Sequence, residues 1–221
     1  MVGENRFSTD KADYILLPER TRGSYTYSDL LVSSEKVSYG ALWKDTHLSL
    51  IQQGGFMLPI REFLDFKTLL SESANVYDGN GRRIDYGRTN SIRDEILTPR
   101  GPWRADWLDA YFDRVDNDMH IFYSHRLING ELRPKRIEHL EDSLLVDGFI
   151  DLGECNKFGL PSKKVDEGTS YYSPMFKCVT WFSASPLGNG LCCSVEPRTF
   201  GEDVGAQNLG ARIAFNRGAL D

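Results

Sequence analysis

The chain has 221 residues, 40% hydrophobic and 26% charged, which is typical of a folded globular protein. A chain this long can bury roughly 70% of its unfolded surface, so it needs neither disulfides nor a metal to hold a core. Its formal net charge of -6 disfavours non-specific binding to nucleic acid or to anionic lipid. No apolar run approaches the roughly 20 residues that span a bilayer, and the N-terminus lacks a signal-peptide core. We therefore expect a soluble protein, and its location stays open.

The first half of the chain carries the helical signals. Residues 14–18 form an apolar patch typical of a short strand. Residues 40–53 gather apolar side chains on one broad face and end at a pair of glycines, which predicts a helix. Residues 56–58 predict a short buried strand, and the proline that opens residues 59–73 occupies a typical helix start. A further short helix is expected over residues 89–97.

The middle of the chain is rich in aromatic residues and turns. The aromatic cluster over residues 98–115 is either a ligand platform or core, and core is the more common outcome. Alternating residues on both sides of Asn129-Gly130 predict a hairpin over residues 119–140. Residues 151–168 are polar and loop-rich. Without an internal repeat or linker, the sequence predicts one α+β domain spanning residues 1–221.

The C-terminal fifty residues hold the most informative pattern. Apolar anchors recur at Val179, Phe182, Ala184, Leu191, Cys193 and Pro197, and in the closing run over residues 209–215. The positions between these anchors share no chemical character, as if a fixed framework carried a variable outward surface. The candidate ligand-binding positions are Phe176, Cys178, Thr180, Trp181, Ser183, Ser185, Leu187, Asn189, Cys192, Ser194 and Arg198. An ordinary alternating strand is the competing interpretation, but Trp, Phe and Cys mixed among Ser and Thr favour binding.

Neither the cysteines nor the histidines form a recognisable metal motif. The four cysteines contain no C-x-x-C pair, so a structural zinc site is not expected. The four histidines are His47, His120, His125 and His139. His47 falls in the first predicted helix, as a surface or satisfied core residue. His125 and His139 could face each other across the hairpin, with Asp118 or Glu138 completing a metal site, although a structural pair is more common. We predict no metal, cofactor or catalytic residue.

The order of elements resembles the C-type lectin fold. The match is carried by residues 40–43, 50, 54–59 and 62–63, which correspond to a Trp-bearing first helix, a glycine, an apolar-Pro step and a second helix that opens with Glu. Residues 209–215 resemble the last strand of such domains, as in the formylglycine-generating enzyme family. Arg212 in that strand is expected to pair with an acidic group. The resemblance implies two helices packed on antiparallel sheets with a long insert.

Within that fold, the anchors over residues 179–215 are similar to those of the variable proteins of diversity-generating retroelements, and the whole chain most resembles an archaeal member of that class. The resemblance implies that a reverse transcriptase copies a template repeat into the coding sequence for residues 171–215 and randomises adenines. The product would bind an unknown protein or surface ligand and would not be an enzyme. Most candidate positions carry residues that randomised AAC codons can reach. Trp181 does not, so it is either fixed or templated by another codon.

Two other functions fit the same scaffold. An enzyme related to the formylglycine-generating family would use a cysteine pair near the C-terminus, whereas Cys192 and Cys193 are adjacent. On a strand, adjacent residues point to opposite faces, and we expect Cys193 inside and Cys192 outside. A calcium-dependent sugar lectin would use a Glu-Pro-Asn motif, but residues 196–198 read Glu-Pro-Arg, and an arginine offers calcium no oxygen.

Overall fold

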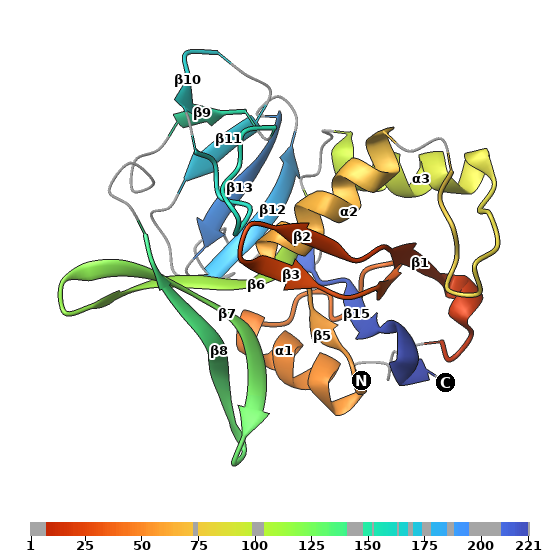
Figure 1. Ribbon diagram of the computed structural model, residues 1–221, viewed down its shortest axis with the longest axis horizontal. Helices are drawn as coiled ribbons and strands as arrows, with labels where there is room; N and C mark the ends of the chain where they lie inside the picture. Colours follow the sequence, from red (N-terminus) through yellow and green to blue (C-terminus); the bar gives the residue numbers. More distant parts are fainter. Residues whose placement is uncertain are drawn as a thin grey trace.

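The computed structural model describes residues 8–72, 75–98, 104–140, 148–151, 153–162, 164–167, 170–173, 178–184, 188–194 and 209–220. Within the strands of residues 170–194, the described side chains are those of Ser170, Tyr172 and Trp181. This part of the chain forms an α+β fold, with helices packed against mostly antiparallel sheets (Figure 1).

A small sheet joins the two ends of the described chain. Its strands, in spatial order, are β1 (Tyr14–Leu17), β4 (Leu30–Ser33), β15 (Ile213–Asn216) and β5 (Phe56–Met57). All three pairings in this sheet are antiparallel. Beside it, β2 (Arg20–Arg22) and β3 (Tyr25–Tyr27) form a hairpin of their own. Because the C-terminal strand lies between β4 and β5, the fold closes only when the end of the chain returns to its beginning.

A larger, nine-stranded sheet carries the rest of the described strands. Its main path is β10 (Lys164–Val165), β9 (Gly148–Ile150), β11 (Ser170–Ser173), β13 (Gly188–Ser194), β12 (Cys178–Ala184), β6 (Arg104–Val115), β7 (Asp118–Ile128) and β8 (Glu131–His139). The short strand β14 (Leu209–Gly210) also pairs with β6. Strand β6 is buried from Arg104 to Ala110, so its sequence lacks the alternation of a half-exposed strand.

Three α-helices connect these sheets, namely α1 (Trp43–Gln52), α2 (Ile60–Glu72) and α3 (Tyr86–Leu97). Helix α2 lies centrally (Figure 1) and contacts β1, β6 and α3. Gly54 ends α1 in the left-handed conformation, at φ 80°. At Gly55, a Cβ atom would lie 2.4 Å from the side chain of Ile213, so strand β15 can approach only a glycine there. The side chain of Asp85 caps α3 by accepting a hydrogen bond from the backbone of Arg88.

Most sequence-based element predictions are confirmed. The first strand, the first two helices, the short strand between them and the hairpin around Asn129-Gly130 all form within a few residues of the predicted bounds. Helix α3 begins three residues earlier than expected, at Tyr86 rather than at residue 89. The aromatic residues Trp107 and Phe112 are core, as expected, but they belong to the long strand β6, which was not predicted. Among the described residues, no helix has the length and apolar character of a membrane span.

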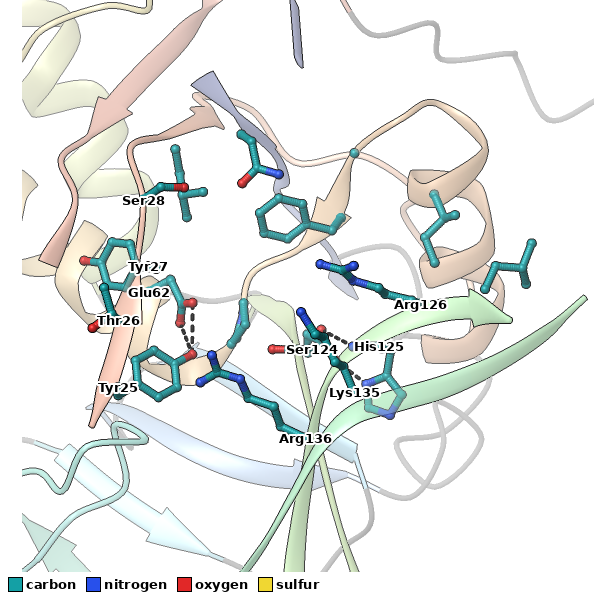
Figure 2. Close-up of a pocket in the computed structure, with 18 of the residues that line it drawn as sticks. Tyr25, Thr26, Tyr27, Ser28, Glu62, Ser124, His125, Arg126, Lys135 and Arg136 are labelled. Carbon is teal, nitrogen blue, oxygen red and sulfur yellow. Dashed lines mark hydrogen bonds and ion pairs between the residues drawn. The ribbon is translucent and has the colours of Figure 1, made fainter. Parts of the chain in front are cut away.

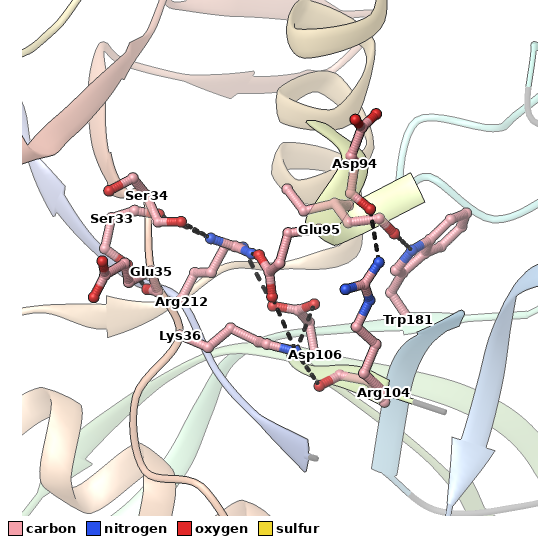
Figure 3. A network of polar contacts seen from close by, with 12 residues as sticks. Ser33, Ser34, Glu35, Lys36, Asp94, Glu95, Arg104, Asp106, Trp181 and Arg212 are labelled. Atoms are coloured by element: carbon pink, nitrogen blue, oxygen red, sulfur yellow. Dashed lines mark hydrogen bonds and ion pairs between the residues drawn. The ribbon is translucent and has the colours of Figure 1, made fainter. Parts of the chain in front are cut away.

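The closing strand is preceded by a buried ionic group, which we call the Arg212 cluster: Lys36, Glu95, Asp106 and Arg212 (Figure 3). Arg212 is 2% exposed, and it pairs with Glu95 and, at 3.3 Å, with Asp106. Its guanidinium also donates to the backbone carbonyls of Ser33 and Ser34. The prediction that Arg212 pairs with an acidic group is therefore confirmed. The cluster connects α3, β6 and the segments that flank β4 and β15.

Burial and charge act in opposite directions on the carboxylates of this cluster. Burial raises the pKa of Asp106 despite the nearby cations Lys36 and Arg212. Burial also acts to raise the pKa of Glu95, but Arg212 and Lys36 together hold that pKa below its ordinary value. Each charge therefore depends on its partners, and the loss of one would leave the others buried and uncompensated.

Candidate functional site

The candidate ligand-binding positions fall partly on two paired strands. Strands β12 and β13 are antiparallel neighbours in the larger sheet, and β12 also pairs with β6. The register places three pairs of candidate positions directly opposite each other: Cys178 with Ser194, Thr180 with Cys192, and Ser183 with Asn189. Phe176, Ser185, Leu187 and Arg198 lie outside the described residues, as does the Glu-Pro-Arg run. Cys192 and Cys193 lie on β13, but the structure does not describe their side chains, so their expected orientations stay predictions.

Trp181 belongs to the core, and the prediction that it lies on the ligand-binding surface is wrong. Its side chain is 1% exposed, and its indole nitrogen donates to the backbone carbonyl of Ile96 at 3.2 Å. The ring lies 5.9 Å from that of Phe63, and the Lys67 ammonium lies 4.6 Å from the ring centroid. A large indole with a satisfied N–H is well suited to the space between sheet and helices.

Alternation along the strands divides the candidate positions into two sets. Residues that face each other in an antiparallel pair, and residues two apart on one strand, belong to the same face. The register therefore puts Cys178, Thr180, Cys192 and Ser194 in one set. Ser183 and Asn189 fall in the other set, which contains the buried Trp181. The surface expected from the sequence is thus not one uninterrupted row of positions.

A pocket of about 630 Å³ opens on another part of the molecule, between the β2–β3 hairpin, the start of α2 and the β7–β8 hairpin (Figure 2). Its lining includes the acidic residues Glu62 and Asp109 together with His125. Exposed Arg126 and Lys135 and half-buried Arg136 also line it. The pocket therefore combines cationic groups with acidic groups that are almost fully buried.

Glu62 is the titratable carboxyl group of this pocket. It is 6% exposed, and both of its oxygens lie within 2.9 Å of the Tyr25 hydroxyl, which donates to them. Burial raises the pKa of Glu62 to about 7, and it raises the pKa of Tyr25 well above its ordinary value. The Arg136 guanidinium lies 5.1 Å from the centroid of the Tyr25 ring. A carboxyl with this pKa exchanges a proton near neutral pH, which a fully ionised glutamate cannot do.

Next to this pocket, three buried side chains from three different elements meet: His47 of α1, Asp109 of β6 and His125 of β7. One carboxylate oxygen of Asp109, Oδ1, lies 3.5 Å from His47 Nε2 and also contacts His125 Nδ1. The other oxygen, Oδ2, accepts the backbone N–H of His125 at 2.9 Å. Ser124, immediately before His125, has a left-handed backbone with φ 58°, which is costly for a residue with a side chain. The fold therefore holds His125 over Asp109 through an unusual backbone conformation.

Aromatic rings form the wall around the three side chains. The Trp43 ring lies 4.2 Å from the ring of His47 and 5.0 Å from that of His125, measured between centroids. Its indole nitrogen is held by the carbonyl of Leu108 at 2.8 Å. His47 is 0% exposed, and burial lowers its pKa to about 4, so its imidazole is neutral at physiological pH.

The sequence-based pairing of histidines is wrong. His125 does not face His139 but meets His47, whereas His139 lies opposite His120, with ring centroids 5.5 Å apart. His47 was expected at the surface or as a satisfied core residue, but it is buried and both ring nitrogens lack a hydrogen-bond partner among the described residues. No sequence motif joins positions 47, 109 and 125, because only the packing of α1 on β6 and β7 brings them together.

Scans against protein-family models, curated proteins and solved structures gave no match to the chain.

Proposed function

We propose that the chain is a ligand-binding protein that displays a variable surface on a C-type lectin-like scaffold and is diversified by a retroelement. The variable segment is residues 171–215, and the candidate positions are those named above without Trp181. The function is binding of a protein or surface ligand without catalysis. The proposed family rests on the resemblance of the sequence to these variable proteins. The arrangement of the strands and the Arg212 cluster gives physical support to the proposal.

The observation that carries the proposal is the Arg212 cluster. Among the described residues, the partners of Arg212 are Ser33, Ser34, Glu95 and Asp106, all of which lie before residue 171 and outside the proposed variable segment. These contacts hold Arg212 through groups that the proposed variation leaves unchanged. Exposed side chains on a framework held in this way can change at a cost of typically less than half a kcal/mol each. This is the property that a diversified binding protein requires.

The arrangement of the strands also supports the proposal. The C-terminal strand β15 closes a sheet with β4 and β5, next to two helices, which matches the resemblance to lectin-like domains. Strands β12 and β13 extend from β6 by main-chain pairing, which does not specify side chains. Trp181 then anchors β12 against α2 and α3. A few fixed anchors thus hold the backbone, while the pairs Cys178–Ser194 and Thr180–Cys192 supply positions free to vary.

The genomic neighbourhood gives the most direct test. The proposal predicts a near-copy of the coding sequence for residues 171–215 close to a reverse-transcriptase gene, with differences confined to adenines of the copy. Codons for Trp181 and Arg212 should be identical in both copies. A neighbourhood without a template repeat and reverse transcriptase would refute the diversification, and differences that fall mainly on the anchor codons would refute the assignment of positions.

Binding itself can be tested with a displayed library. A library randomised at Cys178, Thr180, Cys192 and Ser194 and selected for binding to an unrelated protein should yield folded binders. A site that is already formed before binding loses little conformational entropy when the ligand binds. A matched library at Trp181 and its contact Phe63 should yield mostly unfolded chains. Equal yields of folded binders from the two libraries would contradict the proposal.

A further inference from the structure

We infer that His47, Asp109 and His125 form a binding site for one divalent transition-metal cation. The inference is independent of ligand display, because all three residues lie outside residues 171–215. It rests on the geometry of three side chains that α1, β6 and β7 bring together.

The donor atoms have the chemistry and the spacing of a metal site. One potential ligand atom from each of the three side chains lies within 4.8 Å of the others. Two imidazoles and a carboxylate are ligands that zinc and iron(II) accept, and calcium or magnesium would prefer oxygen alone. Ligands at ~2.0–2.2 Å from a tetrahedral ion are about 3.4 Å apart. The distance of 3.5 Å between His47 Nε2 and Asp109 Oδ1 fits this edge, and the closer contact of Asp109 to His125 would open on binding.

The second observation is the lack of partners for the imidazoles. Both nitrogens of His47 and the Nε2 atom of His125 are buried without a hydrogen-bond partner among the described residues. The two side chains are 0% and 4% exposed. A buried polar group without a partner costs about 1–3 kcal/mol, so a structural histidine pair would be expected to have its nitrogens satisfied. A cation held by one nitrogen of each ring would give His47 one of the partners that it lacks among the described residues.

The contacts around the three side chains also fit a metal site. Asp109 is oriented by the backbone N–H of His125, an outer contact of the kind that fixes metal ligands. Asp109 and His125 also line the 630 Å³ pocket, which offers a path of entry and a place for a further ligand. The rings of Trp43 and Tyr111 pack against His125, with centroids 5.0 and 5.4 Å from that of its imidazole.

The experiment is metal binding by the purified full chain after removal of metals with a chelator. Zinc, iron(II), manganese(II) and cobalt(II) are added separately, and bound metal is measured by mass spectrometry after desalting. We expect one equivalent of zinc or iron(II) per chain, a higher melting temperature, and visible d–d absorption with cobalt(II). Binding of none of the four cations above the buffer level would overturn the inference.

Variants locate the site. His47→Gln and Asp109→Asn should each weaken binding by more than about 100-fold, since even outer-shell partners are worth ~10–100-fold. The matched control removes the other histidine pair, His120→Ala with His139→Ala, and should keep full binding. Loss of binding in this control, with binding retained in the other two variants, would overturn the inference. Far-UV circular dichroism checks the fold, and if His47→Gln does not fold, Asp109→Asn and the cobalt(II) spectrum of the wild type decide.

Discussion

Strand β6 carries two buried carboxylates, Asp106 and Asp109, in contrasting surroundings. Asp106 lies in the Arg212 cluster, where Lys36 and Arg212 approach its carboxylate to 3.9 and 3.3 Å. Asp109 lies between two imidazoles, three of whose nitrogens have no hydrogen-bond partner in the part of the chain that the structure describes. The neighbouring pocket holds Glu62, whose pKa burial raises to about 7. In the Arg212 cluster, opposite charges face each other, whereas Asp109 faces two histidines and a pocket. Buried pairs of opposite charges tie segments of the chain together, whereas buried imidazoles and a carboxylate at the edge of a pocket are candidates for binding something from outside.

The largest expected effect comes from breaking the Arg212 cluster. Arg212→Ala should lower the free energy of unfolding by about 3–5 kcal/mol, because it leaves Glu95 and Asp106 without their main counter-charge. Chemical denaturation measures this loss. The control is Arg217→Ala, which removes a surface ion pair with Asp29 and should cost at most ~1 kcal/mol. Equal losses in the two variants would mean that the cluster is not what holds the C-terminal strand.

Trp181 tests whether strand β12 belongs to the framework. Trp181→Ala should cost about 3–5 kcal/mol of unfolding free energy, because it empties a buried site against Phe63 and the carbonyl of Ile96. Tyr86→Ala removes a side chain that is 76% exposed and should change stability by less than ~0.5 kcal/mol. A Trp181→Ala variant that keeps its stability and loses only ligand binding would return Trp181 to the displayed surface.

Glu62, which lines the pocket, provides a smaller effect on stability that depends on pH. Its folded-state pKa of about 7 lies above the ordinary value of 4.5, so the protonated group favours the folded state. This contribution is fully present below pH 4.5 and is lost as pH rises through about 7, on the order of 3 kcal/mol in all. Denaturation of wild type and Glu62→Gln across this range should show the loss only in the wild type. The same pH slope in both proteins would place the titration elsewhere.

The sequence predicted elements whose signals are local. A glycine pair after an amphipathic run marked the end of α1, and Asn129-Gly130 marked the β7–β8 turn, at φ 52° and 81°. Strand β6 was missed because a strand buried on both faces has no alternation to detect. The meeting of His47 with Asp109 and His125 depends on contacts 62 and 16 residues apart along the chain, which no local pattern encodes. Trp181 was misplaced because an aromatic residue among polar ones fits a binding surface and a core anchor equally well.

We propose that the framework keeps its shape whatever residues occupy the variable positions. The decisive measurement is the unfolding free energy of a panel of variants at Cys178, Thr180, Cys192 and Ser194, each changed to several residue types. We expect changes within ~0.5 kcal/mol per substitution, with an unchanged circular dichroism spectrum. Losses of ~3 kcal/mol or more at these positions, like those expected for Trp181, would contradict this proposal.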